Sequence, residues 1–283
     1  MIYFLTVNYY STSLVTKLLS SIQDRTNISH KIVIINNSPE DNAIHLLKSE
    51  SVLILESGSN LGFGSACNLG LSWIYAQDTQ AIVWLINPDA YIRESVDITL
   101  FFKTYPELSI VGTIIYTPDA KVWFAGGYFI RKTGSIVTQI LHSKAAYTYC
   151  DWVSGCSLLI NLGNFSICPK FDSAYFLYYE DFDFCRRYAS SGHLIGVTEQ
   201  LSVIHQPSEI TNRNIFKKIK YSTYSYLLTI ERYTNKLILL IRLTRLICNA
   251  IILILVKPKL AFGKLYGVLL YLRRSLPSCR TQS

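Results

Sequence analysis

Short runs of aliphatic and β-branched residues alternate with longer segments of helical periodicity in the first part of the chain. The runs at 2–7, 31–35, 52–55 and 81–86 predict buried strands. Between them, Leu14, Leu18 and Ile22 recur at helical spacing after the possible caps at 11–13, and a second helical pattern follows residue 64. This β-α-β-α order predicts an α/β fold with an open, mostly parallel sheet flanked by helices.

The pattern changes after residue 115. Hairpin-like pieces at 122–130 and 136–141 precede a strand at 157–160 and a helix that opens near Glu180, with Gly192 as its stop signal. A shift in charge and the sequence Gln206-Pro207-Ser208 indicate a break near residue 210. We therefore expect one domain over residues 1–210, divided near residue 115, and a separate C-terminal region over 211–283.

Charge is distributed unevenly along the 283 residues. The chain has a formal net charge of +8, yet residues 213–274 hold thirteen lysines and arginines against Glu231 alone, which leaves the first 212 residues mildly acidic. A basic surface attracts nucleic acids, membranes or acidic small molecules. The location of the charge in the C-terminal region helps to choose among these partners.

The C-terminal region has the pattern of an interfacial helix. Residues 237–256 are apolar, but Arg242 and Arg245 near their middle would each cost about 2.5–3.5 kcal/mol in a membrane span. Arg242, Arg245 and Asn249 share one helical face while leucine and isoleucine fill the rest, which favours docking on an anionic membrane surface. Nucleic acid is disfavoured because aliphatic runs accompany the charge; packing of these helices on the preceding domain stays open.

Cysteine usage and the N-terminus bear on the compartment. The seven cysteines form no C-x-x-C pair and no zinc-site spacing, so a reducing compartment is the simpler interpretation. The first residues read as a strand, without the basic segment of a signal peptide.

A glycine-containing loop follows the third predicted strand. Asn60-Leu61-Gly62-Phe63-Gly64 precedes a helix, so its N–H groups could face a phosphate. Cys67 occupies the position of the third small residue in a dinucleotide fingerprint, and the loop follows the third strand instead of the first, which disfavours a nicotinamide enzyme. A purely structural turn is the equally weighted alternative.

Polar residues stand where two predicted strands end. Asp89 follows the strand at 81–86, and His205 ends the apolar run 201–204. Ligands of open α/β sheets bind beyond the carboxyl ends of the strands, and a carboxylate with a neutral imidazole suits Mg²⁺ or Mn²⁺. A turn or cap at Asp89 is the alternative. The other histidines are expected to be structural.

A third acidic group opens the helix near residue 180. Glu180, Asp181 and Asp183 lie at its start and arginines follow, a polarity that the helix dipole explains without any function. Tyr175, Phe176, Tyr178 and Tyr179 precede the acids and would provide a partly dry surface that raises a carboxylate pKa. Such tuning suits a general base.

Together these motifs resemble family 2 glycosyltransferases of the GT-A fold, and within them the rhamnosyltransferases of bacterial O-antigen and related polysaccharides. The resemblance covers about residues 1–235. It rests on the order of the motifs, namely Val7-Asn8-Tyr9, Asn36-Asn37-Ser38, Asn60-Leu61-Gly62-Phe63-Gly64, Asn68-Leu69-Gly70, Asn87-Pro88-Asp89-Ala90, Asp151-Trp152-Val153-Ser154-Gly155, Phe171-Asp172, Tyr179-Glu180-Asp181-Phe182-Asp183 and His205.

The resemblance implies a role for each motif. The first two strand ends would hold the base and ribose of a nucleotide sugar, Asp89 and His205 would bind Mg²⁺ or Mn²⁺ at the donor diphosphate, and Asp181 would be the catalytic base, with Glu180 its nearest competitor. Asp151 and Trp152 would line the donor-sugar or acceptor pocket. The remaining nucleotide-sugar contacts would come from Val7, Asn8, Tyr9, Asn36, Asn37, Asn60, Gly62, Phe63, Asn68 and Asn87.

The implied activity is inverting transfer of L-rhamnose from dTDP-rhamnose to a lipid-linked saccharide for cell-surface polysaccharide (O-antigen). It would take place at the cytoplasmic face of a bacterial inner membrane, with residues 1–115 binding the nucleotide and 116–210 the acceptor. Asn36 departs from the Asp common in relatives, which leaves the nucleotide open. A UDP-hexose donor, or an inactive sugar-nucleotide-binding or membrane scaffold protein, are the alternatives.

Overall fold

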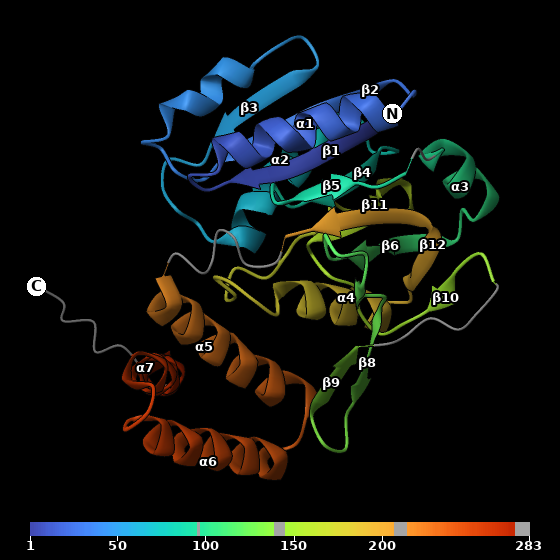
Figure 1. The fold of residues 1–283 in the computed structure, drawn as a ribbon. Helices are drawn as coiled ribbons and strands as arrows, with labels where there is room; N and C mark the ends of the chain where they lie inside the picture. Colours follow the sequence, from blue (N-terminus) through green and yellow to red (C-terminus); the bar gives the residue numbers. More distant parts are fainter. Residues whose placement is uncertain (95–96, 139–144, 207–213, 275–283) are drawn as a thin grey trace, which may run out of the picture. The chain divides into compact units, whose positions relative to one another are not determined.

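The computed structural model describes residues 1–94, 97–138, 145–206 and 214–274 (Figure 1). The chain divides into two compact units. The first comprises Met1–Phe129, Ile136–Phe176 and Glu180–Ile210, and the second comprises Ile130–Ser135, Leu177–Tyr179 and Thr211–Ser283. The C-terminal helices thus share their unit with two short segments from earlier in the chain, which hydrophobic periodicity alone did not indicate.

The first unit is built on a ten-stranded sheet with a principal order β10-β12-β6-β11-β4-β1-β2-β3. Its parallel part consists of the four strands predicted from the first apolar runs, observed as β1 (Ile2–Asn8), β2 (His30–Asn36), β3 (Val52–Glu56) and β4 (Ile82–Ile86). The helical patterns between them form α1 (Thr12–Arg25) and α2 (Phe63–Gln77), and a 3₁₀ helix, η1, spans Asn42–Leu47. The predicted α/β class is confirmed.

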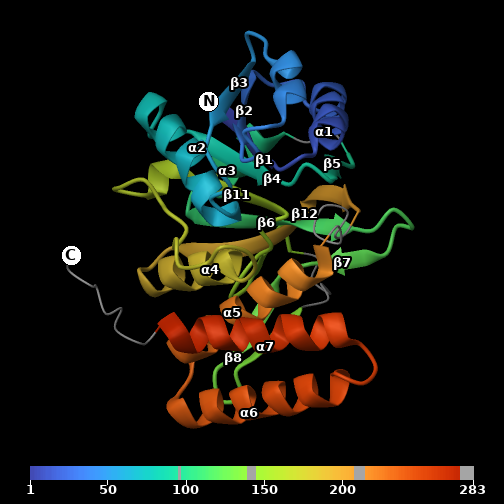
Figure 2. The same ribbon diagram turned by 90° about the vertical axis from the view of Figure 1, so that its left-hand side faces the viewer.

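The strand order creates a switch point between β1 and β4. From β1 the chain moves outward through β2 to β3, and then returns past both to place β4 on the other side of β1. Right-handed crossovers in opposite directions put α1 and α2 on opposite faces of the sheet, as Figure 2 shows. Open α/β sheets bind ligands beyond the carboxyl ends of the strands at such a point.

The rest of the sheet mixes strand directions. β11 (Ser157–Asn161) runs antiparallel between β4 and β6 (Leu108–Tyr116), and β12 (Leu194–His205) is parallel to β6. Shorter strands complete the unit: β5 (Ala90–Ile92), β7 (Val122–Phe124) and β10 (Thr148–Tyr149). The helices α3 (Ile98–Thr104) and α4 (Glu180–Ser190) and the 3₁₀ helix η2 (Leu162–Asn164) connect these strands.

The predicted hairpin region contains two separate pairings. β7 pairs with β6, whereas β8 (Gly127–Ile130) pairs with β9 (Ser135–Thr138) in a small sheet of its own. The break between β7 and β8 falls at Gly126, which has a φ of 88° that suits glycine. The last residues of the piece predicted at 136–141 lie outside the described residues.

The described residues of the second unit form the helices α5 (Ile215–Tyr233), α6 (Lys236–Leu253) and α7 (Pro258–Arg274). Gly267 lets α7 approach α5 closely, since a Cβ there would lie 2.5 Å from the carbonyl oxygen of Lys220. Asn235 caps α6 by accepting a hydrogen bond from the Ile238 N–H at 2.9 Å. Across the described parts of the chain, no helix combines the length and hydropathy that a membrane span requires.

Candidate active site

Asp89 and His205 meet at the carboxyl edge of the sheet. β5 begins directly after Asp89 and pairs antiparallel with the end of β12, so that His205 lies opposite Ala90. The Nε2 atom of His205 is 3.2 Å from Oδ1 of Asp89, and both side chains are about 6% exposed. Sheet register therefore joins two residues that are 116 positions apart in the sequence.

This pair fits a divalent cation. The two atoms that could share one ion are Oδ1 of Asp89 and Nε2 of His205, which face each other; Nδ1 of His205, on the other edge of the ring, is buried without a hydrogen-bond partner in the described ranges. In an octahedral shell with ligands at about 2.1 Å, neighbouring ligand atoms lie about 3.0 Å apart, close to the observed spacing. The described residues contain no group of three or more His, Cys, Asp or Glu side chains suited to a metal ion.

The two acids that open α4 have different environments. Asp181 is half-buried, and its carboxylate accepts hydrogen bonds at 2.8 Å from the N–H groups of Gly155 and Phe182. Glu180 is only 5% exposed, and its Oε2 is buried without a hydrogen-bond partner among the described residues. Burial raises the pKa of Asp181, and it raises that of Glu180 further with the help of the Asp181 charge. Asp181, the base that the resemblance implies, is therefore more accessible than its competitor Glu180.

The segment before α4 differs from the expected aromatic wall. Tyr175 is completely buried, so it belongs to the interior. Tyr178 and Tyr179 adopt left-handed backbone conformations with φ of 69° and 65°. For non-glycine residues such conformations cost about 1–3 kcal/mol each and gather at functional sites. Phe129 and Trp152 pack against the start of α4, with ring centroids 5.2 and 6.1 Å from that of Phe182.

Burial of Glu180 leads to a stability prediction. Because its folded-state pKa is raised, this group favours folding below its unfolded pKa, near about 4.3, and that contribution is lost as the pH rises through the folded value. Glu180→Gln should therefore increase the free energy of unfolding at pH 8, and Tm should rise by about 2–4 °C for each kcal/mol of that increase. The rise in Tm should be smaller at pH 5. Thermal melts at both pH values test this, with the exposed Glu199→Gln as control. An equal shift at both pH values would contradict it.

Asp181 and Asp89 are connected through Gly155 and Cys156. Gly155 donates its N–H to Asp181, and the carbonyl of the next residue, Cys156, accepts a hydrogen bond from the N–H of Asn87 at 2.8 Å. The pKa of the Cys156 thiol is raised by burial and by the negative charges of both Asp89 and Asp181. The carboxylates at 89 and 181 and the imidazole at 205 therefore gather at one end of the sheet.

The ends of β1, β2 and β3 carry a connected polar network. The Asn8 amide donates to Oδ1 of Asn36 at 3.2 Å and to Asp41 at 3.0 Å, while the Asn36 amide donates to the Glu56 carboxylate at 3.0 and 3.3 Å. Asn8 and Asn36 are fully buried, whereas the Glu56 side chain is 45% exposed. Two partly exposed carboxylates therefore lie at this edge, those of Asp41 and Glu56, and Oε1 of Glu56 is also 3.5 Å from Nε2 of His45. Sequence reasoning did not single out Glu56, although it ends β3 as Asn36 ends β2.

The loop before α2 is held by contacts within the protein. Its successive N–H groups at residues 61, 62 and 63 donate to the side chains of Asn37 and Asn60 and to the carbonyl of Phe176, respectively. Gly62 has a φ of 81°, and a Cβ at this position would lie 2.2 Å from the Phe176 carbonyl oxygen. These donors are used by the protein, which favours the structural turn over a phosphate cradle.

Three further predicted site residues also make structural contacts. The Asn68 side chain forms hydrogen bonds at 2.8 Å with both the N–H and the carbonyl of Phe171. Asp151 forms an ion pair with Arg186 at 2.5 Å and accepts a hydrogen bond from the Phe129 N–H at 2.8 Å. Trp152 packs against the Phe124 ring, with a buried indole N–H that has no hydrogen-bond partner in the described residues. Direct contacts of these side chains with a donor sugar or acceptor stay predictions.

Val7 and Tyr9 flank Asn8 at the end of β1. Val7 is buried, and Tyr9 is half-buried with its ring edge-on to that of Tyr10. One aromatic residue near the Asp89–His205 pair was not predicted. Trp123 is 41% exposed and packs edge-on against His205, with 4.9 Å between ring centroids. Its position on β7, which joins the sheet beside β6, gave no local signal of this contact.

Comparison with known proteins places this geometry in context. No family model matches the chain. The chain is 23% identical over 248 residues to the rhamnosyltransferase WbbL of Escherichia coli (strain K12), covering 80% of this chain and 92% of that protein. It is 26% identical over 193 residues to the N-acetylglucosaminyl-diphospho-decaprenol L-rhamnosyltransferase of Mycobacterium tuberculosis, covering 58% of this chain and 62% of that protein. The hexosyltransferase Agl10 of low-salt glycan biosynthesis in Haloferax volcanii is 23% identical over 212 residues, covering 72% of this chain and 67% of that protein.

Solved structures share the fold at low sequence identity. A mannosyltransferase, PcManGT from Pyrobaculum calidifontis, in complex with GDP-Man and Mn²⁺, aligns with a TM-score of 0.56 at 12% identity over 97% of this chain and 88% of that one. GalNAc-T7 with UDP, GalNAc and Mn²⁺ aligns with a TM-score of 0.61 at 12% identity, covering 82% of this chain and 47% of that one. The chain thus spans about half the length of GalNAc-T7.

The fold is that of the GT-A glycosyltransferases, and the resemblance to family 2 of that class is confirmed. Rhamnosyltransferases and a glycan hexosyltransferase are among the relatives, which supports glycosyltransferase activity for this chain.

Proposed function

We propose that the chain is an inverting glycosyltransferase that moves L-rhamnose from dTDP-rhamnose to a lipid-linked saccharide during synthesis of a cell-surface polysaccharide. The observation that carries this proposal is the gathering of the buried Asp89–His205 pair and the half-buried Asp181 at one end of a mainly parallel sheet. The rhamnosyltransferases among its relatives support the choice of sugar.

Asp181 is proposed as the catalytic base. Hydrogen bonds from the Gly155 and Phe182 N–H groups fix the orientation of its carboxylate, and each oxygen keeps a further lone pair for an acceptor hydroxyl. In the reaction the anomeric carbon forms a bond to the acceptor oxygen, its bond to the phosphate oxygen breaks, and the hydroxyl proton passes to Asp181. Attack opposite the leaving group inverts the anomeric centre and needs one base on that face.

Asp89 and His205 would hold Mg²⁺ or Mn²⁺ together with oxygens of the donor diphosphate. Such an ion, when bound, acts as a Lewis acid that stabilises the negative charge on the leaving group. Nε2 of His205 and Oδ1 of Asp89 face each other at 3.2 Å in a buried position, where both atoms could contact one cation. The GalNAc-T7 and PcManGT structures, which contain Mn²⁺ with a nucleotide or nucleotide sugar, support this proposal.

Glu56 is proposed to recognise the pyrimidine base. Thymine and uracil have an N–H at ring position N3, and a carboxylate can accept a hydrogen bond from it. Neutral cytosine has no hydrogen on N3. The oxygen of Asn36 accepts hydrogen bonds from Asn8 and Ser38, and its amide donates to Glu56. The Glu56 side chain is 45% exposed, and besides Asn36 it lies near His45, at 3.5 Å, so its carboxylate keeps lone pairs for a base. A hydrogen bond to a charged group contributes about 1.5–3 kcal/mol, enough to set a nucleotide preference.

A donor screen tests the proposed function. With Mn²⁺ present, dTDP-rhamnose should raise Tm, since a ligand at 100 times its Kd stabilises the native state by about 2.7 kcal/mol. dTDP release should then require a lipid-linked acceptor, and Glu56→Gln should reduce the preference for dTDP over CDP. If a UDP-hexose gives a larger rise in Tm than dTDP-rhamnose and is turned over, the donor is the UDP-hexose and not dTDP-rhamnose. Saturable binding without product for any acceptor would favour an inactive sugar-nucleotide-binding protein.

A further inference from the structure

Helix α6 and the residues after it expose two groups of aliphatic side chains on one face, with the exposed Thr244 and Cys248 between the groups. Six large side chains recur along it and its C-terminal continuation at helical spacing, and each is between 56% and 93% exposed; they are Leu237, Leu240, Ile241, Ile251, Ile252 and Leu255. Exposed apolar surface of this extent is unusual and marks a contact with a partner or a membrane. We call these six residues the α6 stripe.

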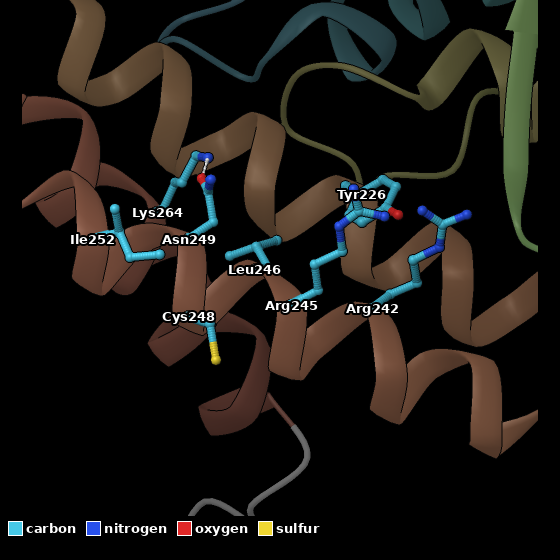
Figure 3. Close-up of a pocket in the computed structure, with 8 residues that line it drawn as sticks. All are labelled: Tyr226, Arg242, Arg245, Leu246, Cys248, Asn249, Ile252 and Lys264. Carbon is cyan, nitrogen blue, oxygen red and sulfur yellow. Dashed lines mark hydrogen bonds between the residues drawn. The ribbon is translucent and has the colours of Figure 1, made fainter.

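A cationic pocket adjoins the stripe within the same unit. Its volume is about 430 Å³, and its lining includes Arg242, Arg245 and Lys264 together with Tyr226 and Asn249. Figure 3 shows Arg242 and Arg245 extending toward Tyr226, while Lys264 donates a hydrogen bond to Asn249 on the other side. Ile252 lines the pocket and also belongs to the α6 stripe, so the charged and aliphatic surfaces are continuous.

The charges in this pocket are positioned but not neutralised. Arg242 donates hydrogen bonds to the carbonyl oxygen of Thr133 at 2.6 and 3.1 Å and to the hydroxyl of Ser135 at 3.1 Å, which are neutral acceptors. Arg245 forms no hydrogen bond or ion pair with any other residue in the described ranges. The lining contains no Asp or Glu. Three cations without a carboxylate attract an anion that carries more than one negative charge.

We propose that this pocket binds the diphosphate group of a polyprenyl-type lipid, whose hydrocarbon chain enters the bilayer beside the α6 stripe. A lipid diphosphate carries at least two negative charges, which match the pocket better than the single charge of a phosphodiester headgroup. The adjoining aliphatic surface favours a membrane-held anion over a free one. That this lipid carries the acceptor saccharide rests on the proposed function; the pocket assignment itself rests on the charges and the stripe.

Vesicle binding by the full-length chain tests the assignment. The probes are phosphatidylcholine vesicles containing geranylgeranyl diphosphate, vesicles containing phosphatidylglycerol at the same surface potential, and inorganic pyrophosphate. We expect the diphosphate vesicles to bind at least tenfold more tightly than the phosphatidylglycerol vesicles. Arg245→Gln combined with Lys264→Gln should remove that advantage. Lys257→Gln combined with Lys259→Gln, which changes the charge equally at exposed positions outside the pocket lining, should retain it.

Cys248 provides a second measurement that reports on the pocket directly. It lines the pocket and is exposed, whereas the other cysteines in the described ranges are buried or half-buried. In a Cys279→Ser background, diphosphate vesicles should slow maleimide labelling of Cys248 at least fivefold, and phosphatidylglycerol vesicles should slow it less.

Three outcomes would overturn the assignment. The first is that both double variants lose the preference for diphosphate vesicles to the same extent. The second is that the wild-type chain binds the two anionic vesicles equally. The third is that pyrophosphate protects Cys248 from labelling as strongly as diphosphate vesicles do. Failure of the proposed function would look different. A chain that binds diphosphate vesicles but no sugar nucleotide would contradict the proposed function and support the pocket assignment. A chain that binds the donor but does not prefer diphosphate vesicles would support the proposed function and contradict the pocket assignment.

Discussion

Asp181→Asn is expected to lower kcat by about 10²–10⁴-fold, the usual contribution of a positioned general base. The amide cannot take up the acceptor proton, although its oxygen can still accept one of the two backbone hydrogen bonds that Asp181 receives. Donor binding should persist, because the nucleotide edge at Asn8, Asn36 and Glu56 is unchanged. Nucleotide release with a verified donor and acceptor measures kcat, and a thermal shift measures donor binding.

The pH profile and a matched variant separate this role from a structural one. Since burial raises the pKa of Asp181, the acid limb of kcat/KM should lie at a higher pH than for an ordinary aspartate, with activity lost as the pH falls through the raised pKa and the base becomes protonated. Glu180→Gln, at the neighbouring buried acid, should change kcat only a few-fold. Normal turnover by Asp181→Asn, or a collapse of turnover in Glu180→Gln alone, would assign the base to Glu180 or elsewhere.

Asp89→Asn and His205→Gln are each expected to raise the Mn²⁺ concentration needed for half-maximal turnover by about 10–100-fold. This is the usual loss of metal affinity when residues around a bound ion are changed. Each change removes one of two donor groups held 3.2 Å apart in a buried site. Wild-type turnover should stop in EDTA and return when Mn²⁺ or Mg²⁺ is added. Titrations of turnover, and of the donor-induced thermal shift, against Mn²⁺ provide the measurement.

His193→Gln is the matched control for this pair of variants. His193 stacks on Phe165 with 4.1 Å between ring centroids and contacts Ser109 through Nδ1 at 3.0 Å, so its loss should affect stability and not the Mn²⁺ titration. Turnover that is insensitive to EDTA would remove the cation from the proposal. An Mn²⁺ titration that is unchanged in both Asp89→Asn and His205→Gln would place the ion at other residues.

Sequence and structure contribute differently to the acidic start of α4. The acids, and a helix that opens near Glu180, were readable from composition and order along the chain. The choice of Asp181 over Glu180 came from the family resemblance and not from local pattern, because adjacent helical positions point in directions that only the surrounding contacts define. In the structure, the Asp181 carboxylate accepts a hydrogen bond from the N–H of Gly155, which lies in a distant segment of the chain. Glu180 packs against α2 instead, because its Cβ lies near the position that a Cβ on Gly64 would occupy.

The glycine loop and the strand-end network illustrate the same division. Glycine, asparagine and turn signals identified residues 60–64 as a loop, but the use of its N–H groups depended on Asn37 and Phe176, which lie elsewhere in the chain. Likewise, the exchange of hydrogen bonds between Asn36 and Glu56 follows from the parallel register of β2 and β3, in which these residues are partners. Periodicity predicts strands but does not determine which residues lie opposite each other.

By itself the sequence determined the four parallel strands with their helices, the polar residues at the strand ends and the basic, aliphatic C-terminal region. These features depend on local periodicity and on the order of residues along the chain, both of which are present in the sequence itself. The resemblance already implied that Asp89 and His205 hold one ion, and the tertiary structure gave the register that brings them together. Only the tertiary structure decided that the Glu56 carboxylate pairs with Asn36, and that Arg242, Arg245 and Lys264 line one pocket. Each of these depends on strand register or helix packing between distant segments, which are set by the burial of whole surfaces and leave no local pattern.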